Sequence, residues 1–434
     1  MSSPMIFLDC PAYLDEATRA RCGLPAEVEC KFVMDSTDGP LDSVMIRCPS
    51  GHFFNAPVEF LLFASQASSV SAQPDRGPVM PHRCLFVPPH VLANIARSHA
   101  RESLEPTAAQ RSATISDQVR RTRRNLAPDG TVVTAAPAGP EAVPQGLTVP
   151  KPGTGGTLIY DDLNQWNFDV KFIRGEGDPA VAGQNANHAY DYLRLIRRFY
   201  KEKLGRNSID NAGLNLVANV NYGAGFDNAF WDGTRMVFGN GDNVIFKDLT
   251  GDLDVPGHEL THGVTQYTAG LNYTQDQSGA LNESFSDMMG SAIDAWASHR
   301  DADSHDWLIG EDIMADDLAG EALRNMAEPG TAYDNPIMGR DPQPRDMSGF
   351  YQPADPHIMS GITNRWFYLI CKEIGMEAGA LIMYQTLQNL WPTAVFNDAA
   401  AVAAAQARIL AEDKQVPPES GQVVRAMARE QGFW

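Results

Sequence analysis

The stretch Val255–Tyr273, VPGHELTHGVTQYTAGLNY, contains two histidines four residues apart, and it decides how the rest of the chain is interpreted. Residues four apart lie on one face of a helix, so the imidazoles of His258 and His262 can reach a single metal ion. Glu259 lies between them and completes the HExxH pattern, in which the histidines bind zinc and the glutamate acts as general base. Five residues alone are a weak signal, so the neighbouring sequence must support them.

A second helix is predicted at Ser278–Trp296, SGALNESFSDMMGSAIDAW, because its apolar residues recur at helical spacing. Glu283 and Asp287 are four residues apart on it and share a face. Glu283 is the candidate third zinc ligand, and Asp287 can accept the N–H of a ligating histidine. Two histidines and one carboxylate leave the fourth tetrahedral position to water, which is typical of a catalytic zinc site. The alternative is a pair of ordinary core helices with a hydrogen-bonded histidine pair.

Five runs of this sequence resemble the thermolysin family of zinc peptidases, over about residues 157 to 434: NAFWDGTRMVFGNGD, HELTHGVTQYTAGLNY, GALNESFSD, WLIGEDI and HIMSGI. Three further runs, GRNSID, PGTAYD and DPQP, are most similar to the protealysin branch of that family. The resemblance implies an α+β fold of two lobes, with a β-rich catalytic lobe at residues 157–300 and an α-helical lobe at 301–434. It also implies a zinc-dependent neutral endopeptidase that cleaves on the N-terminal side of hydrophobic residues and is made as a self-inhibited precursor, a zymogen.

The resemblance assigns further roles to matching positions. Negative charge that grows on the scissile carbonyl needs hydrogen-bond donors, and the family positions for these are Tyr273 and His357. Asn228 and Arg324 would hold the substrate backbone, and Ala229 would offer its carbonyl to the same peptide.

The resemblance also predicts an apolar pocket and calcium sites. The pocket would favour cleavage before Leu, Ile, Val or Phe, and its lining would be Phe246, Leu249, Val255, Ile309, Ile313 and Leu323. Oxygen ligands suit Ca²⁺, and the carboxylates that match the family's calcium ligands are Asp254, Asp294, Asp306 and Glu311. A longer loop, HRDADSHD, alters the spacing of these carboxylates, so the number of calcium sites is left open.

The surroundings of His357 depart from the family pattern. The family has a carboxylate five residues before this histidine, where this chain has Gln352. Asp355, two residues before, is the candidate substitute. If no carboxylate orients the imidazole, we expect turnover to fall about tenfold to a hundredfold.

Residues 1–64 form a small unit rich in cysteine. Zinc is often held by three cysteines and one histidine, and the CPSGH run offers a Cys-x3-His pair. The candidate ligands of a second zinc are Cys10, Cys22, Cys48 and His52. The alternative is that these cysteines are buried as small apolar side chains. Alternating apolar residues predict strands around VECKFVM and SVMIRC.

Residues 65–81 have the composition of a linker, and residues 82–126 resemble the short propeptide of protealysin-like precursors. A short amphipathic helix is predicted after Pro88-Pro89, and the resemblance implies that this segment lies against the catalytic cleft as an inhibitor. The alternative is a connecting helix without a regulatory role. The VRRTRRN run and residues 127–156 are predicted to be exposed and disordered, and a processing cut should fall there.

Composition narrows the classes of partner. The net charge of −20 disfavours nucleic acid and anionic membranes as partners. No apolar run approaches the ~20 residues of a transmembrane helix, and the start lacks the features of a Sec signal peptide. We therefore expect a protein that is cytoplasmic or released by a non-Sec route. Its expected partners are peptide or protein substrates, and a proteinaceous inhibitor is a further candidate.

A second interpretation assigns the chain to another functional class, that of binding or scaffold proteins. It is a catalytically weak protein with a peptidase fold, acting as a scaffold through its Cys-rich N-terminal module. The altered surroundings of His357 favour the scaffold interpretation. The intact HExxH pattern, together with Glu283, Tyr273 and Arg324, favours the interpretation as an enzyme.

Overall fold

The computed structural model describes residues 85–98, 108–116, 153–273, 276–353 and 355–433 in full. For the strands within residues 7–57 and for residues 99 and 117–124 it describes the backbone alone. The chain divides into two compact units, Met1–Pro78 and Val79–Trp434, which are considered separately below.

The first unit contains a four-stranded antiparallel sheet in the order β1-β4-β5-β6 and a separate antiparallel pair, β2 and β3. The strand bounds are β1 Phe7–Asp9, β2 Tyr13–Asp15, β3 Ala20–Arg21, β4 Pro25–Ser36, β5 Gly39–Arg47 and β6 Phe53–Pro57. Strands β4 and β5 confirm the two strands predicted from alternating apolar residues. The four candidate zinc ligands of this unit, Cys10, Cys22, Cys48 and His52, lie outside the described residues.

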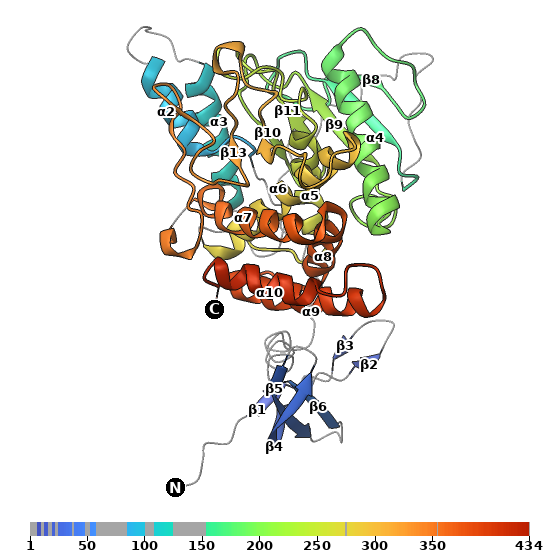
Figure 1. Ribbon diagram of the computed structural model, residues 1–434. Coiled ribbons are helices and arrows are strands. Elements are labelled where there is room, and N and C mark those ends of the chain that lie inside the picture. The colour runs from blue at the N-terminus through green and yellow to red at the C-terminus, as the bar shows by residue number, and fades with distance from the viewer. Residues whose placement is uncertain are drawn as a thin grey trace. The chain divides into compact units, whose positions relative to one another are not determined.

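The second unit is built on a five-stranded mixed sheet in the order β10-β11-β9-β7-β8, drawn in green shades in Figure 1. Strands β7 and β11 run parallel to β9, whereas β10 is antiparallel to β11 and forms one edge. The bounds are β7 Thr157–Asp161, β8 Lys171–Arg174, β9 Leu216–Val220, β10 Ala229–Trp231 and β11 Met236–Phe238. Helix α4 (Gln184–Leu204) contacts β7, β8 and β9 and ends at Gly205, whose φ of 67° suits glycine.

Two central helices connect the sheet to the helical lobe. Helix α5 (Asp254–Gln266) contacts β10 and packs against α6 (Gln277–Ala297). The two backbones approach closely because small residues face each other: a Cβ added to Gly257 would lie 3.1 Å from the Cα of Gly290. Larger residues here would push the helices apart, so these glycines set the distance between the side chains that α5 and α6 present to each other.

The helical lobe begins where α6 packs against α7, and α7 in turn contacts α8 and α10. Figure 1 shows these C-terminal helices on the far side of α5 and α6 from the sheet. The bounds are α7 Pro356–Ile374, α8 Met376–Asn389, α9 Phe396–Glu412 and α10 Ser420–Glu430. The two-lobed α+β fold is thereby confirmed.

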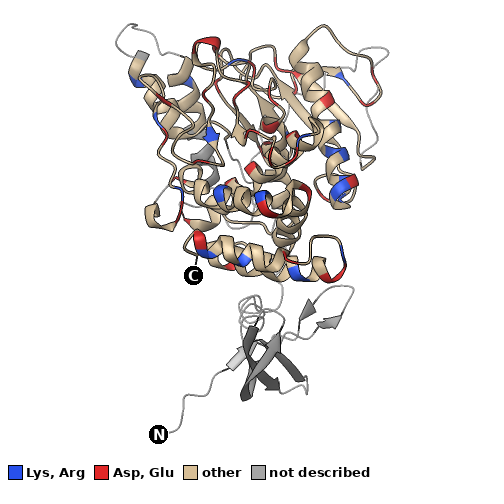
Figure 2. Ribbon diagram, in the orientation of Figure 1, with Lys and Arg blue, Asp and Glu red and all other residues tan. Residues whose placement is uncertain are grey.

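Short pairs and turns connect α6 to α7. They are β12 Leu308–Ile309 with β13 Arg324–Asn325, β14 Asp334–Asn335 with β15 Gly339–Arg340, and the 3₁₀ turns η1 Asp316–Leu318 and η2 Met347–Gly349. Acidic side chains are spread over helices and loops of this second unit (Figure 2). In the described part of the chain, no helix has the length and apolarity that a bilayer crossing requires.

Residues 82–126 contribute two helices, α2 (Pro89–His99) and α3 (Ala108–Arg124), which pack on each other. The apolar side chains of α2 are buried in the main core of the second unit, including Val91, Leu92 and Ile95. We call residues 85–124 the pro-segment. The prediction that VRRTRRN is disordered is wrong for its first six residues, because α3 continues to Arg124. Residues 125–152, which hold most of the predicted processing region, lie outside the described residues.

Candidate metal centre and active-site cleft

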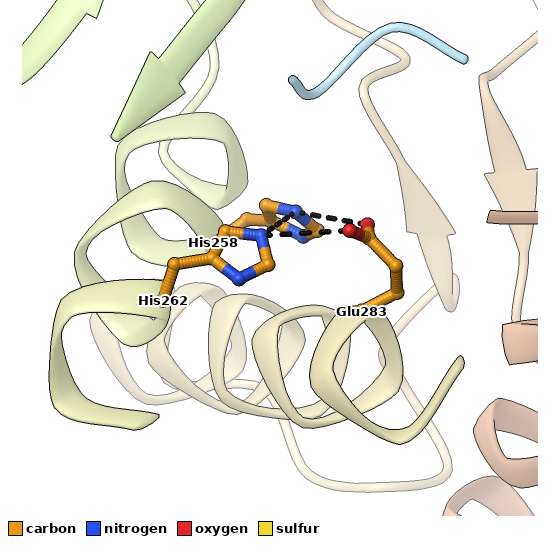
Figure 3. Close-up of side chains that lie close together, drawn as sticks. All are labelled: His258, His262 and Glu283. Carbon is orange, nitrogen blue, oxygen red and sulfur yellow. Dashed lines mark hydrogen bonds and ion pairs between the residues drawn. The ribbon is translucent and has the colours of Figure 1, made fainter. Parts of the chain in front are cut away.

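The candidate zinc ligands come from the two central helices. His258 and His262 are presented by α5 and Glu283 by α6, and all three side chains are buried. One ligand atom from each lies within 4.8 Å of the others. Figure 3 shows the Glu283 carboxylate facing both imidazoles. Glu283 lies 3.5 Å from His258 Nε2 and 3.8 Å from His262 Nε2. Ligand atoms of a tetrahedral zinc site lie about 3.3 Å apart, so this arrangement fits the ion.

The hydrogen bonds of the two imidazoles fix which nitrogen faces the centre. Nδ1 of His258 lies 2.8 Å from Asp287 Oδ1, and Nδ1 of His262 lies 2.7 Å from Asn282 Oδ1. Both partners are acceptors, so the Nδ1 atoms carry the protons and the Nε2 atoms present lone pairs. These two Nε2 atoms are only 2.9 Å apart. Two lone pairs at that distance repel unless a positive charge lies between them.

The electrostatics of the centre attract positive charge. Burial lowers the pKa of His258, but hydrogen bonds to Asp287 and Glu283 outweigh it and raise that pKa to about 9. Burial would raise the pKa of Glu283, but the charges of His357, His262 and His258 hold it well below its usual range. Glu283 is therefore ionised, as a metal ligand must be.

Asp287 supports the metal centre through its hydrogen bond to His258. Its two oxygens accept hydrogen bonds from Arg324 Nη2 and Nε at 2.8 and 2.7 Å, and Asn364 Nδ2 donates to Oδ2 at 2.8 Å. Burial opposes ionisation, but Arg324 and His258 lower the pKa of Asp287 to about 2. An ionised Asp287 holds the His258 ring in the orientation that points Nε2 at the centre.

Glu259 and Glu283 are both fully buried, but their pKa values shift in opposite directions. Its Oε2 accepts a hydrogen bond from the backbone N–H of Trp231 at 2.7 Å, and its Oε1 has no hydrogen-bond partner among the described residues. Burial, reinforced by the charge of Glu283, raises the pKa of Glu259 to about 8. A pair of carboxyls with pKa values driven apart is typical of a site that divides ligand and proton-transfer roles.

His357 has a carboxylate partner in spite of the missing family residue. Asp355 caps the start of α7, accepting a hydrogen bond from the His357 backbone N–H at 3.0 Å, and the same oxygen lies 2.7 Å from His357 Nδ1. Nε2 of His357 lies 2.7 Å from the backbone carbonyl oxygen of Leu85. Both partners are acceptors, so His357 donates from both ring nitrogens in this arrangement. The ring of Tyr273 lies 6.4 Å from that of His357, which brings both predicted oxyanion donors to one place.

The residues expected to hold a substrate backbone hold the pro-segment instead. The backbone N–H of Phe86 donates to Ala229 O at 3.0 Å, and that of Val87 donates to Asn228 Oδ1 at 2.8 Å. Asn228 Nδ2 returns a hydrogen bond to Val87 O, and Arg324 Nη1 donates to Phe86 O at 3.2 Å. Residue 85 also forms an antiparallel bridge with residue 230 at the edge of the sheet.

The side chain of Phe86 is fully buried. Its ring meets the imidazole of His258 edge-on at 5.2 Å, and the Arg324 guanidinium lies over it at 4.9 Å. A Cβ added to Gly310 would lie 3.2 Å from Phe86 and 3.3 Å from Leu323, so these two side chains lie beside the same glycine. The predicted pocket residues are all buried in the core cluster that contains Phe86: Phe246, Leu249, Val255, Ile309, Ile313 and Leu323.

Two of the predicted calcium ligands carry buried oxygens that lack hydrogen-bond partners among the described residues, Asp254 Oδ1 and Glu311 Oε2. The other oxygen of Asp254 accepts from the Gly310 N–H at 2.8 Å. Burial and the nearby charge of Asp252 raise the pKa of Asp254 well above its usual range, and burial raises that of Glu311 to about 7. Such carboxyls ionise readily only with a cation beside them.

The other two predicted calcium ligands have basic side chains nearby. Arg300 Nη1 donates to Asp306 at 2.5 Å, and His305 Nδ1 lies 3.7 Å from Asp294. Both basic residues belong to the longer HRDADSHD loop. Within the described ranges, the zinc triad is the one set of three ligand groups close enough to hold an ion, so the four carboxylates are not gathered around a common point.

Sequence reasoning missed the partners that orient His262. Asn282 and Ser286 flank Glu283 on α6 and both reach His262 Nδ1, the latter at 3.1 Å. Asn282 directly precedes Glu283 and Ser286 directly precedes Asp287, and neither position forms a distinctive pattern in the sequence. Arg324 was expected to hold substrate, and the structure shows that the same guanidinium also holds Asp287.

Two family descriptions match this chain in sequence. "Thermolysin metallopeptidase, catalytic domain" matches residues 145–266, and "Thermolysin metallopeptidase, alpha-helical domain" matches residues 269–426. The boundary between them falls between the two central helices.

Individual relatives agree with these matches. An extracellular metalloprotease of Pectobacterium carotovorum subsp. carotovorum is 42% identical over 54% of this chain and 70% of its own length. A thermolysin of Bacillus sp. (strain EA1) is 39% identical over 56% of this chain and 45% of its own length. The solved precursor of protealysin from Serratia proteamaculans superposes with a TM-score of 0.67 at 33% identity, over 81% of this chain and 100% of that one. This chain therefore belongs to the thermolysin family of metallopeptidases, and it is a metalloendopeptidase.

Proposed function

We propose that this metalloendopeptidase binds its catalytic zinc through His258, His262 and Glu283. The observation that carries the proposal is the convergence of three ligand groups: the two Nε2 atoms lie 2.9 Å apart, and an ionised carboxylate faces both. When bound, zinc supplies a Lewis acid for the scissile carbonyl and an activated water at neutral pH.

The surrounding side chains have distinct roles in this proposal. Glu259 takes a proton from the attacking water and delivers it to the leaving amine, a task that suits a carboxyl with a raised pKa. His357, oriented by Asp355, and Tyr273 donate hydrogen bonds to the carbonyl oxygen as its negative charge grows. Arg324 holds the next carbonyl of the substrate.

The chain is further proposed to be a self-inhibited precursor with a preference for hydrophobic residues after the cleaved bond. The pro-segment supports both statements. Its backbone takes the hydrogen bonds of Asn228, Ala229 and Arg324 that a substrate needs, so the two compete for one set of partners. Its Phe86 ring is buried beside Leu323, one of the residues expected to line the apolar pocket, and a substrate side chain of similar character would replace it.

Structural calcium near Asp254 and Glu311 and a second zinc in the Cys-rich module also belong to the proposal. Unpartnered buried carboxylate oxygens support the first. A rise in the melting temperature with added calcium would support it, and no change would contradict it. Zinc content per chain tests the second: two ions point to a metallated N-terminal module, and one points to the catalytic site alone.

A peptidase assay tests the main proposal. The purified protein, before and after its pro-segment is nicked with trypsin, is given a quenched peptide containing Leu, with and without chelator. We expect cleavage before Leu that rises on nicking, stops with chelator and is absent in Glu259→Gln. Zinc-replete nicked protein that cleaves nothing would instead favour the scaffold function.

A further inference from the structure

The pro-segment lies in the cleft in the direction and register of a substrate. Three consecutive backbone groups meet three different partners: Leu85 O meets His357 Nε2, Phe86 N–H meets Ala229 O, and Phe86 O meets Arg324 Nη1. The chain also adds to the open edge of β10, as extended peptides do when they bind an exposed strand.

One peptide bond is singled out by this register. The carbonyl that receives a hydrogen bond from the oxyanion donor His357 is that of Leu85, so it lies where an attacked carbonyl belongs. The next carbonyl, that of Phe86, is held by Arg324. The side chain after the Leu85 carbonyl is that of Phe86, and its burial beside Leu323 matches the expected preference for a hydrophobic residue.

We propose that the Leu85–Phe86 peptide bond is an intramolecular self-cleavage site of this chain. The inference rests on the proposed peptidase function. Water adds its oxygen to the Leu85 carbonyl carbon, and the bond from that carbon to the Phe86 nitrogen breaks. Glu259 receives the two water protons in turn and passes them to the Phe86 nitrogen, so the products are a carboxylate at Leu85 and an ammonium group at Phe86.

The cut divides the precursor without opening the cleft. Residues 1–85, which include the Cys-rich unit, become a separate chain. The new N-terminus at Phe86 stays in place, because Val87 keeps its hydrogen bonds to Asn228 and α2 keeps its buried apolar side chains. Loss of the N-terminal unit and gain of activity are therefore separate steps.

The test uses the full-length, zinc-loaded chain. It is incubated over a hundredfold range of concentration, and the products are identified by intact mass and N-terminal sequencing. We expect a fragment that begins at Phe86, formed at a first-order rate that does not depend on concentration. Glu259→Gln should remain uncut. Phe86→Asp should lose the cut by at least about tenfold, and Phe86→Leu, which keeps an apolar residue for the pocket, should retain it.

Three results would overturn the inference. One is a rate proportional to concentration, or equal cutting of labelled Glu259→Gln chain by added wild type, which would show that the cut is intermolecular. Another is an intact Leu85–Phe86 bond in a preparation that hydrolyses the quenched peptide after trypsin nicking; the proposed peptidase function would then stand. Absence of both reactions in zinc-loaded protein would contradict the function and the inference together.

Discussion

Replacing Phe86 by alanine should activate the intact precursor. The ring is fully buried against His258 and Arg324, and its loss leaves an apolar cavity. Truncating a buried phenylalanine to alanine costs about 3–5 kcal/mol. Since about 1.4 kcal/mol is tenfold in an equilibrium constant, the fraction of chains with an open cleft should rise at least about a hundredfold.

The measurement is the initial rate of quenched-peptide cleavage by intact precursor, relative to the same protein after nicking. We expect this ratio to rise about a hundredfold or until it reaches the nicked value. Arg97→Ala is the control, because it truncates a long, exposed side chain of the pro-segment whose one hydrogen-bond partner among the described residues is Asn94. If Phe86→Ala stays at the wild-type ratio while nicking activates both proteins equally, Phe86 does not hold the cleft closed.

Three further changes test the side chains around the centre. Asp355→Ala should lower kcat/KM of the nicked enzyme about tenfold to a hundredfold, because His357 loses its acceptor at Nδ1; Asp355→Ser keeps the helix cap and should restore the melting temperature but not the rate. Asn282→Ala should weaken zinc about tenfold to a hundredfold in a buffered titration by releasing His262, and unchanged affinity would exclude that role. Burial lowers the pKa of His90 to about 4, below the ordinary value of about 6.5, so the docked pro-segment favours the neutral ring. Docking should therefore be strongest above pH 6.5 and weaken as the pH falls toward 4. Gel filtration of nicked protein should show the pro-segment separating more at pH 5 than at pH 7, with a smaller difference in His90→Gln, and equal separation at the two pH values would contradict this.

Spacing along a helix made the metal ligands predictable. His258 and His262 are one turn apart, and Glu283 and Asp287 are one turn apart, so each pair shares a face whatever the rest of the chain does. The distance between the pairs depends on how closely two helices pack, and here it follows from Gly257 meeting Gly290. Nothing in the order of residues shows that contact.

Contacts made by turns and by neighbouring helices were harder to foresee. Whether Asp355 could reach His357 depended on the turn before α7, which places one oxygen near both the backbone and the ring. The prediction for the end of α3 was wrong because an arginine-rich run can be solvated on the surface of a helix as well as in exposed coil. The length of the HRDADSHD loop is visible in the sequence, whereas the pairing of Arg300 with Asp306 depends on how the loop folds.

Strand β10 ends its sheet, and among the described residues Leu85 and Phe86 complete its outer side. A bare strand edge invites other polypeptides to add to it, which leads to aggregation. During translation, residues 85–124 leave the ribosome before the strand that they later cover. The newly made chain therefore already contains the segment that covers this edge. That segment can prevent strand pairing with other copies as soon as β10 forms.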